Sequence, residues 1–323
     1  MPAGVAMMNS TKAFSMGMTS VECLKNLALD VIGARVQSMT GSESSLDDFR
    51  TPAGDPGLFG PDSMAWRVHA HFTSMMVGGL SSLIVQALHP RALAAVWDHS
   101  NFRHNLKSRL GRTAYFVAAT TYGAEDLAME SIRRVNAIHA GIRGVDQQGQ
   151  PYVANEPDLV RWVHLVEVSS FLSAYQHLSV APLSARACDL YIAEMTRVGH
   201  LLGAVELPQD WASTQAELLA YRATLRFDDR AKEILRVVES YPVEGLDKPF
   251  MTWVLQSAMD IMPAWALALI QRDPGCPPGQ MTRRCALQVA SQPIQWTLDT
   301  RGVSAIARKR VDSATVRVQK SQP

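Results

Sequence analysis

The chain has 323 residues, a formal net charge of +1, and 47% hydrophobic against 19% charged residues. This composition is typical of a globular protein, and its length suffices for one large core, which we expect rather than two smaller domains. The near-neutral charge argues against a general attraction to nucleic acid, so no nucleic-acid partner is predicted.

Cysteine usage and the N-terminus bear on the cellular compartment. The four cysteines, Cys23, Cys188, Cys276 and Cys285, form no CxxC pair and no disulfide-dense pattern, which is typical of a reducing compartment. The first 20 residues lack the basic start and the continuous apolar run of a signal peptide. We therefore predict a cytoplasmic protein.

The N-terminal region, residues 1–55, is expected to be an arm followed by one helix. Residues 1–20 show little periodicity, whereas Val21 to Met39 carry aliphatic residues at helical spacing. A connection rich in Gly, Pro, Ser and Asp then leads to Ser63. We expect the main helical domain to occupy residues 56–300.

The segment from Met64 to Trp97 predicts core helices. Its part from Val77 to Leu88 is apolar nearly all round, as in a helix at the centre of an all-α core, and it is too short and interrupted to span a membrane. Gly78 and Gly79 would permit close approach of another helix or of a flat ligand. Pro90 ends or kinks the helix.

Three histidines between residues 69 and 99 are expected to have structural roles. His69 and His71 are two residues apart and would point to different sides of a helix, so they cannot bind one metal together; we predict capping or surface roles. His99 is expected to satisfy backbone groups at a helix end.

Two helices joined at Tyr122-Gly123 fill the stretch from 104 to 144. In the first, Arg109, Arg112, Thr113 and Phe116 fall on one helical stripe, so two cations and a hydroxyl are predicted to point toward an apolar face. A buried cation of this kind needs an anion.

In the second helix His139 shares a stripe with Ile132, Val135 and Ile142. An imidazole among aliphatic side chains needs a partner or a ligand. One interpretation is a core histidine whose ring nitrogens form hydrogen bonds within the protein, and another is the axial ligand of a haem iron. Protein carboxylates that could pair with His139 or with the arginines are Asp126, Glu130 and Glu167.

The rest of the chain continues the helical pattern. A turn-rich loop follows residue 144, and helices are predicted for 159–178, for 184–203 with Ser184 as its cap, and from Trp211 and Asp228. Pro249 to Ile270 is predicted to be a core or lid helix in preference to a segment docked on a membrane surface. The basic residues after 300 are expected to form a solvated helix end with a disordered extension. No segment alternates long enough to predict a strand, so the fold class is all-α.

Common catalytic motifs are missing. The chain has no GxGxxG after a strand, no GxxxxGK[ST], no HExxH, no GxSxG and no EF-hand loop. These absences argue against the nucleotide, zinc-protease, serine-hydrolase and calcium sites that the motifs build.

Four successive segments together resemble one family. They are GGLSSLIVQALHPRALAAVWDHSNFR, RLGRTAYFVAATTYG, RVNAIHAGIRG and GQPYVANEPDLVRWVHLVEVSSFLSAY. In this order they resemble the family of the rubber oxygenases (latex-clearing proteins) and the MpaB-type oxygenases. The likeness covers Phe59 to Gly203 and extends weakly to MPAWALALI.

This resemblance implies a globin-reminiscent helical bundle around a pocket for one b-type haem. The histidine of the RVxxxH pattern, here His139, would be the proximal iron ligand. The RxxxT motif corresponds to Arg109 and Thr113, with Arg112 as the basic residue before the threonine. These three residues would be catalytic and would lie at the haem together with Phe116: Thr113 would hydrogen-bond dioxygen, and Arg109 would anchor a propionate or the distal network.

Two departures from the family pattern limit what it implies. Arg112 stands where the rubber oxygenase has a lysine that can occupy the distal iron position. A guanidinium stays protonated and is a poor ligand, so no closed, lysine-like state is expected. The glutamate proposed as base in the rubber oxygenase has no counterpart, since the matching helix offers Gln86 and His89 instead.

Three hypotheses follow. The first is a haem b-dependent oxidoreductase, an oxygenase that uses dioxygen on a hydrophobic small molecule. The second is a haem-binding or gas-sensing protein without turnover. The third is a helical protein without haem, in which Arg109 and His139 pair with the protein's own carboxylates. The substrate and the oligomeric state do not follow from the sequence.

Overall fold

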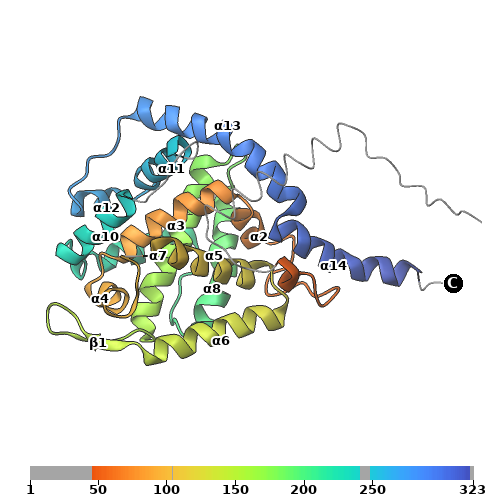
Figure 1. The fold of residues 1–323 in the computed structure, drawn as a ribbon, viewed down its shortest axis with the longest axis horizontal. Helices are drawn as coiled ribbons and strands as arrows, with labels where there is room; N and C mark the ends of the chain where they lie inside the picture. The colour runs from red at the N-terminus through yellow and green to blue at the C-terminus, as the bar shows by residue number, and fades with distance from the viewer. Residues whose placement is uncertain (1–45, 104, 241–247, 321–323) are drawn as a thin grey trace, which may run out of the picture.

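The computed structural model describes residues 46–103, 105–240 and 248–320. The described chain is predominantly helical (Figure 1), which confirms the all-α prediction. The predicted arm at 1–20 and the predicted helix at 21–39 lie outside the described residues. Within them, the turn-rich loop after residue 144 contains a small antiparallel hairpin of β1 (Arg143–Val145) and β2 (Pro151–Val153) that was not predicted.

The hairpin divides the helices into two groups along the chain. Those before it are η1 (Leu46–Phe49), α2 (Met64–His69), α3 (Phe72–Gln86), α4 (Pro90–His99), α5 (Leu106–Tyr122) and α6 (Glu125–Gly141). Those after it are α7 (Pro157–Leu178), α8 (Ala185–Leu201), α9 (Trp211–Ala220), η2 (Tyr221–Ala223), α10 (Asp229–Glu239), α11 (Lys248–Asp260), α12 (Ala264–Leu269), α13 (Pro277–Arg301) and α14 (Val303–Lys320).

Side-chain caps fix where several helices begin. Ser184 accepts a hydrogen bond from the Ala187 amide at the start of α8, as predicted. His71 caps α3 by accepting from the Ser74 amide, which confirms a capping role for that histidine. His99, at the end of α4, contacts the Arg143 carbonyl oxygen at 3.2 Å, as expected of a group that satisfies backbone at a helix end.

His69 differs from its predicted capping or surface role. It is buried, and its two ring nitrogens contact Thr121 Oγ1 at 2.7 Å and Tyr191 Oη at 3.0 Å. Because both nitrogens are satisfied, the ring is tolerated in the core without a charge. Burial lowers the pKa of His69 to about 3.

The pair α3 and α7 forms the centre of the fold. Gly78 of α3 lies against the backbone of Ser170 and Phe171, where even a methyl group would lack room. The predicted close approach at the glycine pair is therefore an approach to another helix. One end of the pair is held by Trp162, which is fully buried and donates from Nε1 to the Gln86 carbonyl oxygen at 3.2 Å.

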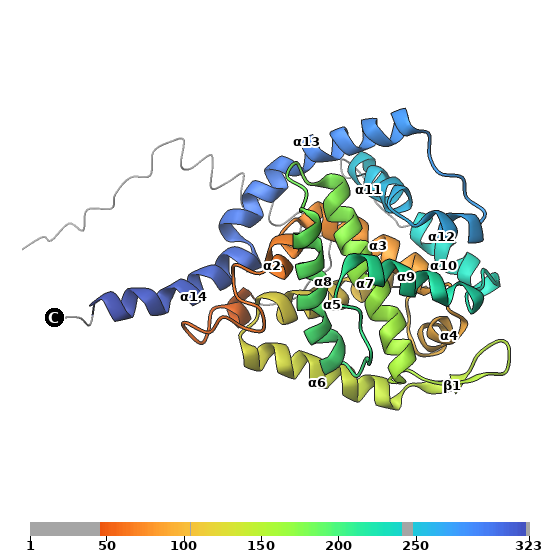
Figure 2. The same cartoon turned by 180° about the vertical axis from the view of Figure 1, so that it is seen from behind.

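Other helices cover this central pair. In Figure 2, α11 and α13 cover one end of it and α6 runs along the opposite edge of the molecule. Val254, Ala258 and Ala266 are completely buried, which confirms the core interpretation of 249–270. The carboxylate of Asp260, which is almost inaccessible to solvent, is held by two hydrogen bonds from Arg283 of α13 at 2.6 and 2.9 Å.

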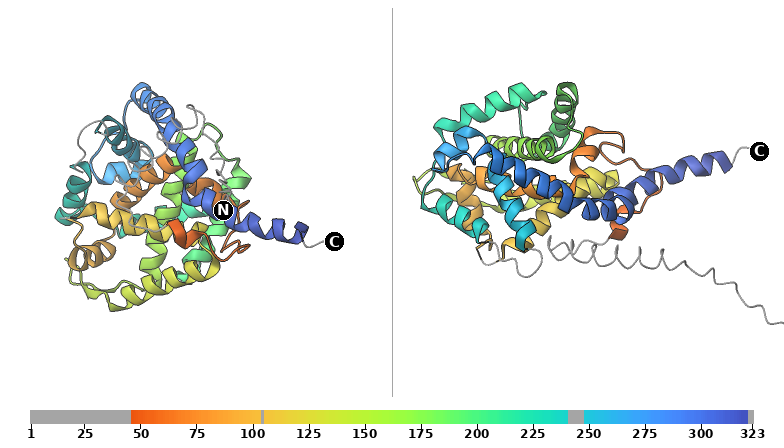
Figure 3. Two further views of the ribbon diagram at one scale, coloured as in Figure 1. Left: turned by 45° about the vertical axis from the view of Figure 1, so that its right-hand side comes forward. Right: turned by 90° about the horizontal axis from the view of Figure 1, so that it is seen from above.

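The basic C-terminal segment departs from the predicted solvated end. Figure 3 shows α14 leaving the body of the molecule, but its first half is packed. Ile306 and Ala307 are buried, and Arg310 donates hydrogen bonds to the carbonyl oxygens of Phe49 and Asp55. This arginine satisfies backbone acceptors of the N-terminal connection, which composition alone did not reveal.

No single helix in the described ranges meets the length and hydropathy needed to cross a membrane. The bent pair formed by α3 and α4 meets them jointly, across a 105° break.

The central contact gives a stability prediction. We expect Gly78→Ala to lower the free energy of unfolding by about 1–3 kcal/mol, because the new Cβ would lie 2.9 Å from both Phe171 Cδ1 and the Ser170 carbonyl oxygen. At Gly79 the added Cβ would meet only Phe171 Cε1, at 3.9 Å. Gly79→Ala is therefore the matched control, and we expect it to stabilise the helix by about 0.5–1 kcal/mol. Urea unfolding followed by circular dichroism measures both, and equal destabilisation by the two changes would contradict the close contact.

Candidate functional site

Arg109 lies in the first half of α5, whose start is capped by Asn105. Its side chain is part-buried, and Nη1 donates to Ser100 Oγ at 3.1 Å. In the described part of the chain it forms no ion pair with a carboxylate. Burial, assisted by the nearby charge of Arg112, lowers the pKa of Arg109 to about 10. Arg109 is therefore still a cation at neutral pH, without an anion to balance it.

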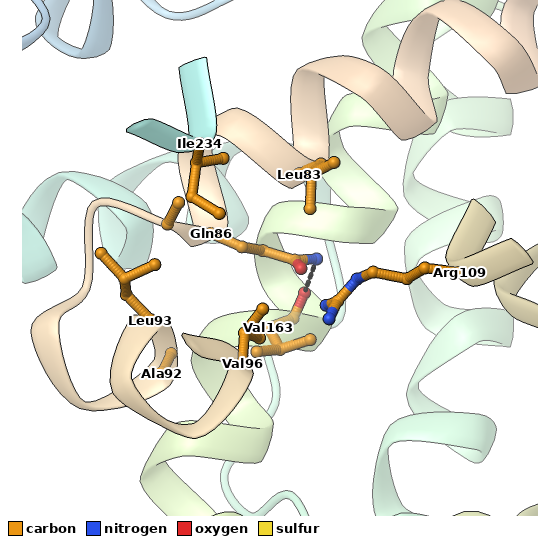
Figure 4. A pocket seen from close by; sticks show the side chains of 9 residues that line it. Leu83, Gln86, Ala92, Leu93, Val96, Arg109, Val163 and Ile234 are labelled. Carbon is orange, nitrogen blue, oxygen red and sulfur yellow. Dashed lines mark hydrogen bonds between the residues drawn. The ribbon is translucent and has the colours of Figure 1, made fainter. Parts of the chain in front are cut away.

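The guanidinium of Arg109 points into a small cavity between α3, α4, α7 and α10 (Figure 4). The cavity measures about 30 Å³, and its walls include Leu83, Gln86, Leu93, Val96, Val163 and Ile234. Gln86 Nε2 donates to the Val163 carbonyl oxygen at 3.4 Å and to Ser82 Oγ at 2.7 Å. This volume holds one or two water molecules, so the cavity itself is no haem pocket.

Arg112 and Thr113 lie on the same stripe of α5 but are exposed, whereas the sequence predicted them to point inward. Arg112 Nη1 donates to Ser108 Oγ at 2.8 Å, and Thr113 Oγ1 donates to the Arg109 carbonyl oxygen at 3.2 Å. The reason is the packing of α5, which buries its opposite face. Farther along the stripe Phe116 is part-buried against the α6 residues Ala128 and Ile132.

His139 lies in the last turn of α6, close to the start of α7. The two segments are tied together by a hydrogen bond from the Ala154 amide to the Ile142 carbonyl oxygen at 2.9 Å. The imidazole is part-buried and makes no hydrogen bond to any described residue. Burial lowers the pKa of His139, so the ring is neutral at pH 7 and has a nitrogen lone pair free to bind a metal.

The protein's own carboxylates do not pair with these groups. Asp126 and Glu130 are exposed on α6, and Glu167 of α7 is part-buried. None of the three forms an ion pair with Arg109 or His139 among residues 46–103, 105–240 and 248–320. The interpretation without haem, in which protein carboxylates satisfy Arg109 and His139, has no support in these contacts.

The donor set can be compared with what different metal centres need. Among the described residues no three His, Cys, Asp or Glu side chains converge as they would around a zinc ion or a mononuclear non-haem iron. A haem iron takes four nitrogens from the porphyrin and needs only one protein ligand, and the propionates need cations. A neutral His139 and an unpaired Arg109 fit these needs.

Sequence reasoning missed two titratable groups on α7. His164 is buried against Gly199 of α8, and burial, with the charge of His200, lowers its pKa to about 4. Glu167, named only as a candidate partner, accepts no hydrogen bond from the described residues, and burial raises its pKa to about 7. The signal was two titratable residues three apart in α7, between the apolar residues Leu165, Val166 and Val168.

Comparison with known proteins gives the class of the fold. Residues 66–314 match the family described as "ER-bound oxygenase mpaB/B'/Rubber oxygenase, catalytic domain", which makes this an oxygenase-type catalytic domain. The match spans most of the chain, and the protein belongs to this family. No curated protein and no solved structure matches the chain.

The carboxyl group of Glu167 makes stability depend on pH. Its folded-state pKa of about 7 lies above the ordinary 4.5, so between these values the native state holds a proton that the unfolded state has lost. The wild-type free energy of unfolding should therefore fall, relative to that of Glu167→Gln, as pH rises from 4.5 to 7, and then level off. Allowing for partial exposure, we expect a change of about 1–3 kcal/mol.

Urea unfolding at a series of pH values measures this difference. Glu130→Gln, at an exposed position on α6, is the matched control. A constant difference between wild type and Glu167→Gln across this range would show that Glu167 is not desolvated in the folded protein.

Proposed function

We propose that the protein is a haem b-dependent oxygenase that uses dioxygen on a hydrophobic small molecule, with His139 as the axial iron ligand. The observation that carries this proposal is a pair of groups in a member of an oxygenase family. The neutral imidazole of His139 forms no hydrogen bond to a described residue, and the cationic guanidinium of Arg109 has no carboxylate partner among them. Haem, when bound, supplies the chemistry with dioxygen, which amino-acid side chains lack.

Each residue of the site has a distinct task in this proposal. His139 holds the iron, and Arg109 balances the negative charge of a propionate. Arg112 and Thr113 line the distal side from the exposed stripe of α5. A guanidinium is a poor metal ligand, so Arg112 would not ligate the iron itself. Thr113, whose hydroxyl donates to the Arg109 carbonyl oxygen in this structure, would present that hydroxyl beside the bound group, and Phe116 would form part of an apolar wall.

The apolar surroundings favour a hydrophobic substrate. Val163 lines the cavity at Arg109 together with Leu83, Leu93 and Val96, and apolar side chains of this kind line sites for hydrophobic ligands. The haem-binding domain of this proposal lies within residues 56–300. The cysteine pattern favours a cytoplasmic location for the protein.

Removal of the proposed ligand tests the haem assignment. We expect His139→Ala to reduce bound haem at least about tenfold, since no other side chain replaces the iron ligand. The measurement is the Soret absorbance per protein, checked by the pyridine haemochrome assay and by the thermal unfolding midpoint. His99→Ala changes an exposed histidine that contacts the Arg143 carbonyl oxygen and the Tyr152 ring, and it should keep the wild-type haem content. Unchanged haem in His139→Ala would overturn the ligand assignment.

The charge of Arg109 is tested in the same way. Arg109→Met keeps most of the side-chain volume and removes the cation, and we expect haem affinity to fall about tenfold because a propionate loses a charge-assisted partner. Haem transfer to apomyoglobin measures this affinity. Arg133→Met, at an exposed position on α6, should transfer haem at the wild-type rate. Equal rates for Arg109→Met and wild type would contradict the role of Arg109.

Oxygen consumption separates an enzyme from a haem carrier. The haem-loaded protein, supplied with an alkene or a terpenoid, is expected to consume dioxygen faster than it does without substrate. Haem binding without substrate-dependent consumption over a broad panel would favour the second hypothesis, a haem-binding or gas-sensing protein.

A further inference from the structure

Ser100, the C-terminal cap of α4, contacts Arg109 but has no task in the proposed function. Its Oγ accepts a hydrogen bond from Arg109 Nη1 at 3.1 Å. Among the residues that the structure describes, this is the only hydrogen bond of the Arg109 side chain. An arginine side chain has many rotamers, and holding it in one direction costs conformational entropy. The direction of the guanidinium therefore depends on this one acceptor.

The end of α4 that carries Ser100 is itself anchored to two other elements. Asp98 Oδ2 accepts a hydrogen bond at 3.0 Å from the hydroxyl of Tyr152 in β2, a side chain that is almost completely buried. Asp98 Oδ1 accepts a hydrogen bond from Arg230 Nη1 of α10 at 3.3 Å. Because the hairpin and α10 both hold this end of α4, Ser100 offers Arg109 an acceptor at a fixed place.

The charge of Arg112 makes such an acceptor necessary. It contributes to lowering the pKa of Arg109, so the two guanidinium groups repel each other. In the structure each arginine is held by a serine: Arg112 donates to Ser108 Oγ at 2.8 Å, and Arg109 donates to Ser100. The Arg109 guanidinium faces the cavity in this position (Figure 4). Without Ser100 no described side chain would hold it there.

The end of α4 also lies against the segment that follows His139. Strand β1 begins at Arg143, directly after the last turn of α6, and α4 packs against both strands of the hairpin. One short segment therefore contacts Arg109 through Ser100 and the neighbourhood of His139 through the hairpin. A haem that binds both groups requires their relative positions to be fixed before it arrives.

We propose that Ser100 is a positioning residue, which orients the guanidinium of Arg109 toward a haem propionate from the anchored end of α4. The inference rests on the proposed function for the part that concerns haem, whereas the ordering of Arg109 by Ser100 can be measured without haem. Ser100 acts through Arg109, so the loss of its hydroxyl should matter only while Arg109 is present.

A double-mutant cycle tests this dependence. Ser100→Ala removes the acceptor, and we expect it to transfer haem to apomyoglobin about three- to tenfold faster than wild type. In the Arg109→Met background the same change should have no further effect, because contributions made through one contact are not additive. Ser240→Ala, at the exposed C-terminal cap of α10, is the matched control and should transfer haem at the wild-type rate.

Ser100→Thr tests whether the hydroxyl alone is responsible. The backbone at Ser100 is extended, with φ −128° and ψ 141°, and such a backbone accommodates a β-branched side chain. Threonine keeps the acceptor oxygen, so we expect haem transfer within about twofold of the wild-type rate. Circular dichroism and the thermal midpoint show that each variant is folded.

A second readout needs no haem. In the full chain labelled at arginine, the Nε–H signal of Arg109, assigned by its loss in Arg109→Met, reports how fast the guanidinium rotates about its Nε–Cζ bond. We expect rotation in Ser100→Ala to be at least about threefold faster than in wild type, because the hydrogen bond that slows it is lost. Ser100→Thr and Ser240→Ala should keep the slow rotation.

Three results would overturn the positioning role of Ser100. They are equal rotation in wild type and Ser100→Ala, unchanged haem transfer by Ser100→Ala at normal haem content, and equal acceleration with and without Arg109. Absence of haem from wild type is a different result, which overturns the proposed function. The rotation measurement then still decides whether Ser100 orders Arg109.

Discussion

The close contact between α3 and α7 is the constraint on which the rest of the structure depends. Gly78 has no room for a side chain against the backbone of α7, so the two helices meet at their backbones over a central stretch. Helices α11 and α13 pack on α3, and α8 and α9 pack on α7. Because α7 is fixed on the α3 side, its other residues, including His164 and Glu167, are held at defined places toward α8 and the cavity at Arg109.

The candidate site is defined by a guanidinium without a carboxylate partner and an imidazole without a hydrogen bond among the described residues. Most buried polar groups in the described chain are paired, as His69 is by Thr121 and Tyr191 and Asp260 is by Arg283. Arg109, which has no carboxylate partner among the described residues, and His139, which forms no hydrogen bond to any of them, are the two groups on which the proposed site rests. In the proposed function, His139 would hold the haem iron and Arg109 would balance a propionate.

The sequence predicted much of the fold because helical periodicity and caps are local signals. The apolar run at 77–88, the Ser184 cap and the core role of 249–270 are all confirmed. The features that the sequence did not predict correctly, the exposure of Arg112 and Thr113 and the burial of Arg310, depend on how distant parts of the chain pack together. The inward direction predicted for Arg112 and Thr113 is wrong, since both side chains are exposed in the described structure. Arg310 is buried, and carbonyl oxygens more than 250 residues away accept its hydrogen bonds. Helix α13 was not predicted for a local reason, because its polar and apolar residues show no clear helical periodicity and it contains Pro293.

The central claim is that this fold binds haem through His139 with an accessible distal position. The most direct measurement is the difference spectrum of the reduced protein with and without carbon monoxide, recorded on the preparation used for the pyridine haemochrome assay. The account predicts b-type haem and a carbon monoxide spectrum typical of histidine-ligated haem. Protein that carries no haem after expression with ample haem supply, or haem that does not bind carbon monoxide, would contradict it.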